Sequence, residues 1–136
     1  MNSDLSSRQT HWEEAYRNKD NFVFYPHEEV IRFFFKYIRK RVGLNEFIDI
    51  DQFLVPGGGR VLDLGCGIGR HVIYCHDMGL DAYGIDLSQE AIALAKRWAA
   101  ERGMPRSESR IIAGDVRALP WDDGFFAYGV SHGVLD

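Results

Sequence analysis

The sequence contains few of the features that mark disulfide-rich, membrane-spanning or secreted proteins. It has only two cysteines among 136 residues. Cys66 and Cys75 do not form a Cys-x-x-Cys pair, so no disulfide framework is predicted. No apolar run approaches the roughly 18 residues that a bilayer span requires, and the start has no basic region followed by an apolar stretch, as a secretory signal would. The sequence therefore predicts a protein of the reducing cytoplasm with no membrane partner.

The chain also lacks an excess of positive charge. Its formal net charge is -4, which gives it no general attraction for nucleic acid or anionic lipid. Apolar residues make up 46% and charged residues 26% of the chain, as in ordinary globular proteins. Its length is enough for a single domain with a buried core and too short for two.

The first 56 residues have a helical pattern. A short helix is predicted over 8–18, and Tyr25-Pro26 breaks it. A second helix is predicted over 27–42, because its apolar residues follow helical spacing and its acidic start and basic end suit the helix dipole. Residues 56–59, Pro-Gly-Gly-Gly, interrupt the pattern. The predicted division is a helical segment over 1–56 and a single domain over 57–136.

After this break, β-prone and helical stretches alternate. Such alternation predicts an α/β fold with a doubly wound, mostly parallel sheet, whose right-handed crossovers place helices on both faces. Ser88 is the predicted N-cap of the longer helix. The predicted strands are 60–64, 81–86, 110–113 and 125–131, and the predicted helices are 70–78 and 88–102.

The most informative motif follows the first of these strands. Residues 61–70 read Val-Leu-Asp-Leu-Gly-Cys-Gly-Ile-Gly-Arg. Glycine allows a sharp turn and lets a ligand approach the backbone without a Cβ in the way, and the next helix offers free N–H groups. A turn of this kind alone could bind NAD, FAD, a phosphate or S-adenosylmethionine.

Asp63 narrows the choice among these ligands. Its carboxylate lies two residues before Gly65, where it would repel a pyrophosphate but suit a ligand with an amino group and a sulfonium. The Gly-x-Gly-x-Gly spacing also differs from the Gly-x-Gly-x-x-Gly of dinucleotide sites, which argues against a nicotinamide-dependent oxidoreductase. A capping role for Asp63 in the turn remains an alternative.

Two further aspartates lie at strand ends, on the edge where open α/β sheets bind ligands. Asp86 ends the second strand, where an acidic residue can accept hydrogen bonds from both ribose hydroxyls. Asp115 follows the third strand, where it could accept a hydrogen bond from an adenine amino group while Val116 packs on the ring. The alternatives are a solvent-exposed strand end for Asp86 and an ordinary turn for Asp115.

Together these three sites resemble the class I S-adenosylmethionine-dependent methyltransferases, and the resemblance covers residues 59–136. The stretch 119–126 resembles the family's entry into its fourth strand, although Ala127 stands where the family usually has an aspartate. The resemblance implies a Rossmann-like fold and S-adenosylmethionine as the cofactor. It implies cofactor contacts for Asp63, Gly65, Cys66, Gly67, Gly69, Arg70, Asp86, Leu87, Asp115, Val116, Ser131 and His132.

The resemblance implies transfer of a methyl group from sulfur to an acceptor. A small-molecule acceptor is favoured over nucleic acid because no basic groove is apparent. No catalytic residue is identified, since methyl transfer chiefly needs alignment of the reacting atoms; a general-base role for His132 is a weak alternative. The N-terminal segment is expected either to cover the cofactor with Trp12, Tyr16 and Tyr25 near the pocket, or simply to pack on the sheet.

The family normally continues beyond a fourth strand, whereas this chain stops at Asp136. We therefore expect a piece of a longer protein, or a homodimer in which a second copy covers the open edge of the fourth strand. The alternative function is a non-catalytic cofactor-binding or self-pairing module.

Overall fold

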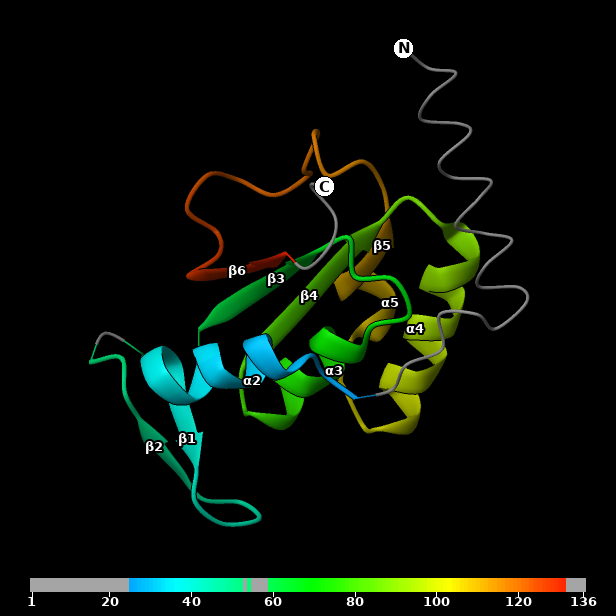
Figure 1. Cartoon of the computed structure of the whole chain (residues 1–136). Coiled ribbons are helices and arrows are strands. Elements are labelled where there is room, and N and C mark those ends of the chain that lie inside the picture. Colours follow the sequence, from blue (N-terminus) through cyan, green and yellow to red (C-terminus); the bar gives the residue numbers. More distant parts are fainter. Residues whose placement is uncertain (1–24, 53, 55–58, 132–136) are drawn as a thin grey trace.

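The fold, taken from a computed structural model, is described for residues 25–52, 54 and 59–131 (Figure 1). The predicted helix over 8–18, with Trp12 and Tyr16, lies outside this part of the chain, and so does His132. The predicted domain division at residues 56 and 57 also falls in an undescribed stretch.

A parallel sheet forms the centre of the molecule. Its strands are β3 (Arg60–Leu64), β4 (Asp81–Asp86), β5 (Ile111–Ala113) and β6 (Tyr128–Ser131), in the spatial order β5-β4-β3-β6. All three pairings are parallel, which confirms the predicted α/β class. The last strand is shorter than predicted: it begins at Tyr128 rather than at residue 125.

Two crossover helices connect these strands as the sequence predicts. The helix α3 (Arg70–Asp77) follows Gly69, and α4 (Gln89–Glu101) begins after Ser88, whose hydroxyl accepts a hydrogen bond from the backbone N–H of Ala91 at 3.1 Å. This bond satisfies one of the free donors of the first turn. A further single turn, α5 (Ser107–Arg110), was not predicted.

Among the described residues, both crossover helices lie on one face of the sheet, whereas the sequence predicted helices on both faces. On one face, side chains of α3 and α4 pack against alternate strand residues, which include Val61, Ala82, Ile111 and Val130. On the opposite face, Tyr83 makes edge-to-face contacts with three rings from the stretch before β6, with centroid distances of 5.3–5.9 Å. These rings belong to Trp121, Phe125 and Phe126.

The N-terminal segment differs from the single helix predicted over 27–42. It forms α2 (Glu28–Phe33), a π-helical turn η1 (Phe34–Ile38), and an antiparallel pair of β1 (Arg39–Arg41) and β2 (Phe47–Asp49). The prediction was wrong beyond Ile38, because Arg39 adopts an extended backbone and its Nε–H donates to Asp49 Oδ1 at 2.7 Å. The basic residues Arg39–Arg41 are therefore part of a hairpin and do not complement a helix dipole.

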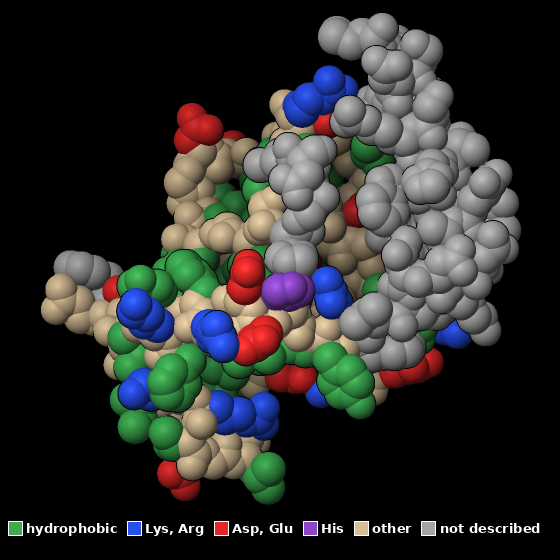
Figure 2. All heavy atoms as spheres, viewed as in Figure 1, with side chains coloured by type: hydrophobic (Ala, Val, Ile, Leu, Met, Phe, Trp, Pro, Cys, Tyr) green, Lys and Arg blue, Asp and Glu red, His purple; other side chains and the backbone are tan. Residues whose placement is uncertain are grey.

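Many apolar side chains of this segment are exposed. Val30, Phe34 and Ile38 are buried at four-residue spacing, whereas Phe35 is 56% and Leu44 84% exposed. Figure 2 shows these hydrophobic surfaces among lysine and arginine side chains over α2, β1 and β2. Within the described part of the chain, no helix is long and apolar enough to cross a bilayer.

β6 lies at one end of the sheet order and pairs with β3 on its inner side. Among the described residues no strand pairs with its outer side. A homodimer through this edge stays a prediction.

Candidate functional site

The predicted site lies at the carboxyl edge of the sheet. Because the strands are parallel, the ends of β3, β4, β5 and β6 meet at this edge. The register pairs Asp63 with Gly84 and with Val130, and pairs Asp86 with Ala113. The fold therefore brings together the glycine turn and the strand-end aspartate, as expected from the sequence.

The glycine turn folds back onto the end of β4. The backbone N–H groups of Gly65 and Cys66 both donate to the carbonyl of Ile85, at 2.8 and 3.0 Å. Gly65, Gly67 and Gly69 all have positive φ angles, of 72°, 55° and 88°. This left-handed region is strained for residues with a Cβ, so the turn requires glycine at each of its three alternate positions.

Asp86 is fixed by the turn that it faces. Its Oδ2 accepts the backbone N–H of Gly67 and its Oδ1 accepts that of Ser88, both at 2.9 Å. Burial raises the pKa of Asp86, while the backbone donors of Ser88, Gly67 and Leu87 oppose this shift. Each carboxylate oxygen has two lone-pair sites, so Asp86 keeps capacity to accept hydroxyl groups from a ligand.

Asp63 is the most unusual polar group in the described structure. It is 2% exposed, and its Oδ2 accepts no hydrogen bond within the described residues. Burial, and then the charge of Asp86, raise the pKa of Asp63 well above its ordinary value, and the charge of Arg70 opposes them. A buried acceptor without a donor costs free energy, and a positively charged donor placed here would remove that cost.

We expect Asp63→Asn to stabilise the ligand-free protein at neutral pH. The raised pKa means that the folded state holds the Asp63 proton more tightly than the unfolded chain does. The contribution of this proton to the free energy of unfolding is therefore complete below the ordinary pKa of 3.8 and declines as the pH rises toward the folded-state pKa. Asparagine carries no charge and removes this decline. The free energy of unfolding at pH 7 should rise by about 1 kcal/mol.

Urea unfolding of both proteins at pH 4 and pH 7 tests this expectation. The gain should shrink toward pH 4, where the Asp63 carboxyl of the folded protein is largely protonated and the pH approaches the ordinary pKa of 3.8. A variant that is less stable than the native protein at pH 7 would show that the carboxylate has a stabilising partner.

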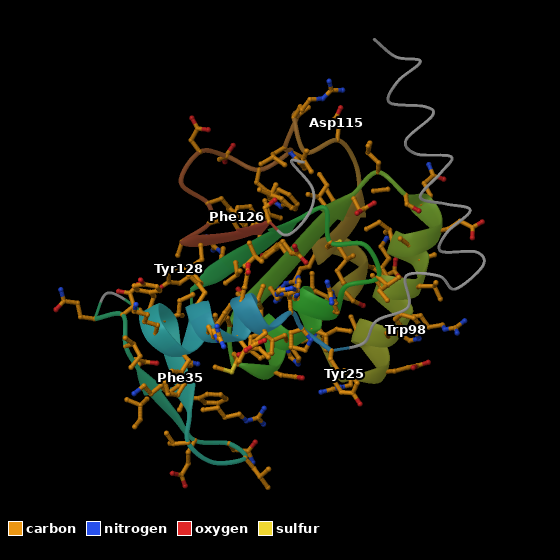
Figure 3. All side chains as sticks on the ribbon, viewed as in Figure 1. Tyr25, Phe35, Trp98, Asp115, Phe126 and Tyr128 are labelled. Carbon is orange, nitrogen blue, oxygen red and sulfur yellow. The ribbon has the colours of Figure 1, made fainter. Side chains whose placement is uncertain are left out.

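Arg70 and His71, at the start of α3, hold the segment that precedes α2. One guanidinium N–H of Arg70 donates to the carbonyl of Tyr25 at 3.2 Å, and the backbone N–H of His27 donates to His71 Nε2 at 3.0 Å. Figure 3 labels Tyr25, which comes just before α2. The sequence predicted a cofactor contact for Arg70. In the structure, the Arg70 side chain binds the backbone carbonyl of Tyr25.

His71 is the functional candidate that sequence reasoning missed. Cys75 lies four residues after His71 on α3, yet within the described residues no group of three metal-ligating side chains forms. Instead His71 Nδ1 lies 4.0 Å from Asp63 Oδ2, with both side chains buried. No local pattern could have revealed this arrangement, because it joins β3, α3 and the segment before α2.

Asp115 lies in the loop after β5, as Figure 3 shows. Its carboxylate is held by the neighbouring Arg117, which donates from its backbone N–H at 2.9 Å and from its guanidinium at 2.8–3.1 Å. The Arg117 guanidinium lowers the pKa of Asp115. The contact between Asp115 and an adenine amino group stays a prediction. The adenine amino group would have to share this carboxylate with Arg117.

The remaining residues predicted to contact the cofactor lie around the carboxyl edge of the sheet. Cys66 is buried and its thiol faces the carbonyl of Gly67 at 3.8 Å; burial raises the pKa of this thiol well above its ordinary value, so it stays protonated. Leu87 and Val116 are half-buried, and Ser131 is exposed beside Leu64. A groove of about 580 Å³ between α4 and β5, lined by Gln89, Lys96 and Glu108 among others, contains none of the predicted residues.

This geometry fits a ligand with a cationic donor and neighbouring hydroxyl groups. Asp63 Oδ2, which accepts no hydrogen bond from the described residues, fits an ammonium group, and the fixed carboxylate of Asp86 fits a diol. The glycines of the turn carry no Cβ, so a ligand can approach the backbone there closely. Two carboxylates at the same edge disfavour a pyrophosphate.

Comparisons with known proteins agree with this geometry. Residues 61–136, more than half of the chain, match the family model described as "Methyltransferase domain". A 2-heptyl-1-hydroxyquinolin-4(1H)-one methyltransferase from Mycobacteroides abscessus is 48% identical over 46 residues, which cover 34% of this chain and 20% of that protein. The S-adenosyl-L-methionine-dependent Diels-Alderase iccD from Talaromyces variabilis is 30% identical over 65 residues, covering 48% of this chain and 22% of that protein.

A solved structure extends the likeness to three dimensions. Geranyl diphosphate methyltransferase, in complex with GPP and sinefungin, is 25% identical and superposes with a TM-score of 0.50, covering 58% of this chain and 29% of that one. The chain spans about a fifth of the length of the two curated relatives.

Proposed function

Because the chain belongs to the methyltransferase-domain family, we propose that it forms the cofactor-binding part of an enzyme that methylates a small-molecule acceptor. The cofactor of this domain is S-adenosylmethionine. The observation that carries the proposal is the buried Asp63 Oδ2, which has no hydrogen-bond donor among the described residues and lies beside the glycine turn and the fixed Asp86 carboxylate.

Each residue has a proposed part in holding the cofactor. Asp63 binds the ammonium group of the methionine portion, and the Asp86 carboxylate, held by Gly67 and Ser88, binds the ribose hydroxyls. Gly65, Gly67 and Gly69 allow the backbone to approach the ligand closely. Asp115 and Val116 remain the proposed adenine contacts.

The chemistry requires little proton transfer. When bound, S-adenosylmethionine supplies a methyl group on a positively charged sulfur, and the thioether that remains is neutral. The protein's task is then to orient the cofactor and to exclude water, as expected for catalysis through positioning. Burial of Asp63, at the end of β3, and of Cys66, within the turn, serves both purposes.

The relatives support a small-molecule acceptor and also raise a second function. The printed name of the Mycobacteroides relative identifies a quinolone derivative as its substrate, and that of the solved neighbour identifies geranyl diphosphate. The Talaromyces relative is a Diels-Alderase that depends on the same cofactor. Binding of S-adenosylmethionine without its consumption is therefore the alternative, whether in a cyclisation or in a non-catalytic module.

Calorimetric titration tests the cofactor site. S-adenosylhomocysteine is expected to bind the folded protein at one site per chain, and NADH is expected to give no saturable heat. Binding of NADH without S-adenosylhomocysteine would replace the proposal with a nucleotide-dependent oxidoreductase.

A second assay separates the two functions. The protein is incubated with S-adenosylmethionine and 2-heptyl-1-hydroxyquinolin-4(1H)-one, the compound in the relative's name, and with a set of other small hydroxyl and thiol compounds. Release of S-adenosylhomocysteine with a methylated product supports methyl transfer. A protein that binds the cofactor but consumes none across the set supports the alternative.

A further inference from the structure

The segment before α2 is bound directly to the helix that follows the glycine turn. Arg70 and His71 are the first two residues of α3, and they hold the carbonyl of Tyr25 and the N–H of His27, respectively. These contacts join parts of the chain separated by 45 and 44 positions. The N-terminal segment therefore contacts the first turn after the proposed cofactor loop.

The His27 end of this connection fixes how α2 begins. His27 is the N-cap of α2, its carbonyl accepts from Val30 at 3.0 Å, and its Nδ1 accepts from Glu29 at 3.1 Å. Val30 and Phe34 then enter the main core. A change in the bond between His27 and His71 would thus alter the seating of α2 on the sheet.

The other end of the connection is Asp63. Because His71 Nε2 accepts the His27 N–H, the neutral ring carries its proton on Nδ1, and Nδ1 is the atom that lies 4.0 Å from Asp63 Oδ2. Both side chains are about 95% or more buried, where charges act strongly on neighbouring dipoles. A single imidazole therefore lies between the cofactor carboxylate and the N-terminal segment.

We propose that His71 is a positioning residue that couples cofactor binding at Asp63 to the seating of the segment Tyr25–His27. The proposal rests on the cofactor site proposed above. A cationic ligand group at Asp63 holds this side chain as a carboxylate, which attracts the Nδ1–H of His71. That polarisation makes Nε2 a better acceptor for the His27 N–H, because bonds in such a chain strengthen one another.

The coupling acts in both directions. If ligand binding strengthens the His27 bond, then a seated segment must strengthen ligand binding by the same factor. Couplings of this kind typically change affinity by about 5-fold or more. His71 thus contributes to affinity through Asp63 and the segment, without itself contacting the ligand.

The direct test is amide hydrogen exchange at His27, measured by NMR on nitrogen-15-labelled protein with and without saturating S-adenosylhomocysteine. In the native protein the ligand is expected to slow exchange of this amide by about 5-fold or more. In His71→Leu the slowing should disappear, and affinity in calorimetry should fall by a similar factor. His76→Leu, on the last turn of the same helix, is the matched control and should behave as the native protein.

His71→Gln provides a second variant, because glutamine keeps an oxygen that can accept the His27 N–H and an amide that can donate toward Asp63. It should recover part of the slowing that leucine abolishes. A native protein that binds S-adenosylhomocysteine with no change at the His27 amide overturns this inference alone, even if His71→Leu does not fold. A folded native protein that binds no S-adenosylhomocysteine overturns the proposed function, and the coupling with it.

Discussion

Asp86→Ala is expected to weaken S-adenosylhomocysteine binding by about 100-fold or more. Hydrogen bonds to a charged acceptor contribute about 1.5–3 kcal/mol each, and about 2.7 kcal/mol corresponds to 100-fold in affinity. The substitution would remove the proposed ribose contacts. It would also release the Gly67 N–H that now donates to Asp86 at 2.9 Å, so the glycine turn would lose part of its order. Calorimetric titration measures the effect.

Asp81→Ala is the matched control for this experiment. Asp81 begins the strand that Asp86 ends, and its carboxylate binds Arg110 at 2.6 Å, away from the glycine turn. Its removal should change affinity by less than about 3-fold, since each tenfold requires 1.4 kcal/mol of lost contact. Equal losses in the two variants would show that the effect comes from β4 in general and would argue against a ribose contact at Asp86.

Gly84→Ala is expected to lower the free energy of unfolding by about 1–3 kcal/mol, the usual cost of overpacking a core. A Cβ at this position would lie 2.8 Å from Cys66 Sγ and 2.8 Å from a methyl carbon of Val72. Both neighbours are buried, with Val72 fully enclosed, so neither has free space to move into. Urea unfolding followed by circular dichroism measures the change.

Gly129→Ala tests whether this cost comes from the crowded site or from glycine in a strand. Gly129 lies in β6 of the same sheet, and a Cβ there would meet nothing within 4 Å. Replacing such a glycine should leave stability unchanged or raise it by about 0.5–1 kcal/mol. A loss at Gly129 as large as that at Gly84 would contradict the packing explanation.

The sequence predicted the parts of the fold that depend on local chemistry. The positive φ angles of Gly65, Gly67 and Gly69 need glycine, and a hydroxyl at Ser88 caps the helix that follows it. Turn and cap requirements of this kind act over a few residues. For this reason the strand, the turn, α3 and α4 could all be located from the sequence with nearly correct limits.

The errors arose where distant contacts decide the structure. The pattern from residue 27 to 42 favours a helix, yet Arg39 binds Asp49 in the hairpin and the carbonyl of Met78 at 3.0 Å. Tertiary contacts of this kind override local propensity. They are also the reason that no local pattern indicates the bond between His71 and His27.

The proposed site was only partly accessible from the sequence. The positions of Asp63 and Asp86 at strand ends follow from the alternation of strands and helices. Burial of Asp63 with no donor to its Oδ2 from the described part of the chain does not follow from any pattern, because it depends on how α3 covers β3. The pairing of Asp115 with Arg117 was equally hidden, although the two residues are only two apart.

The strand order has a consequence for how the chain folds as it leaves the ribosome. The central strand β3 gains β4 as a neighbour early, but its other neighbour, β6, is made only after α3, β4, α4 and β5. Until then one edge of β3 is open to pairing with other chains. Domains that rely on such late, distant pairing fold slowly and are exposed to misassembly during synthesis. A nascent chain stalled before Tyr128 should therefore expose the edge of β3 that β6 covers in the folded protein.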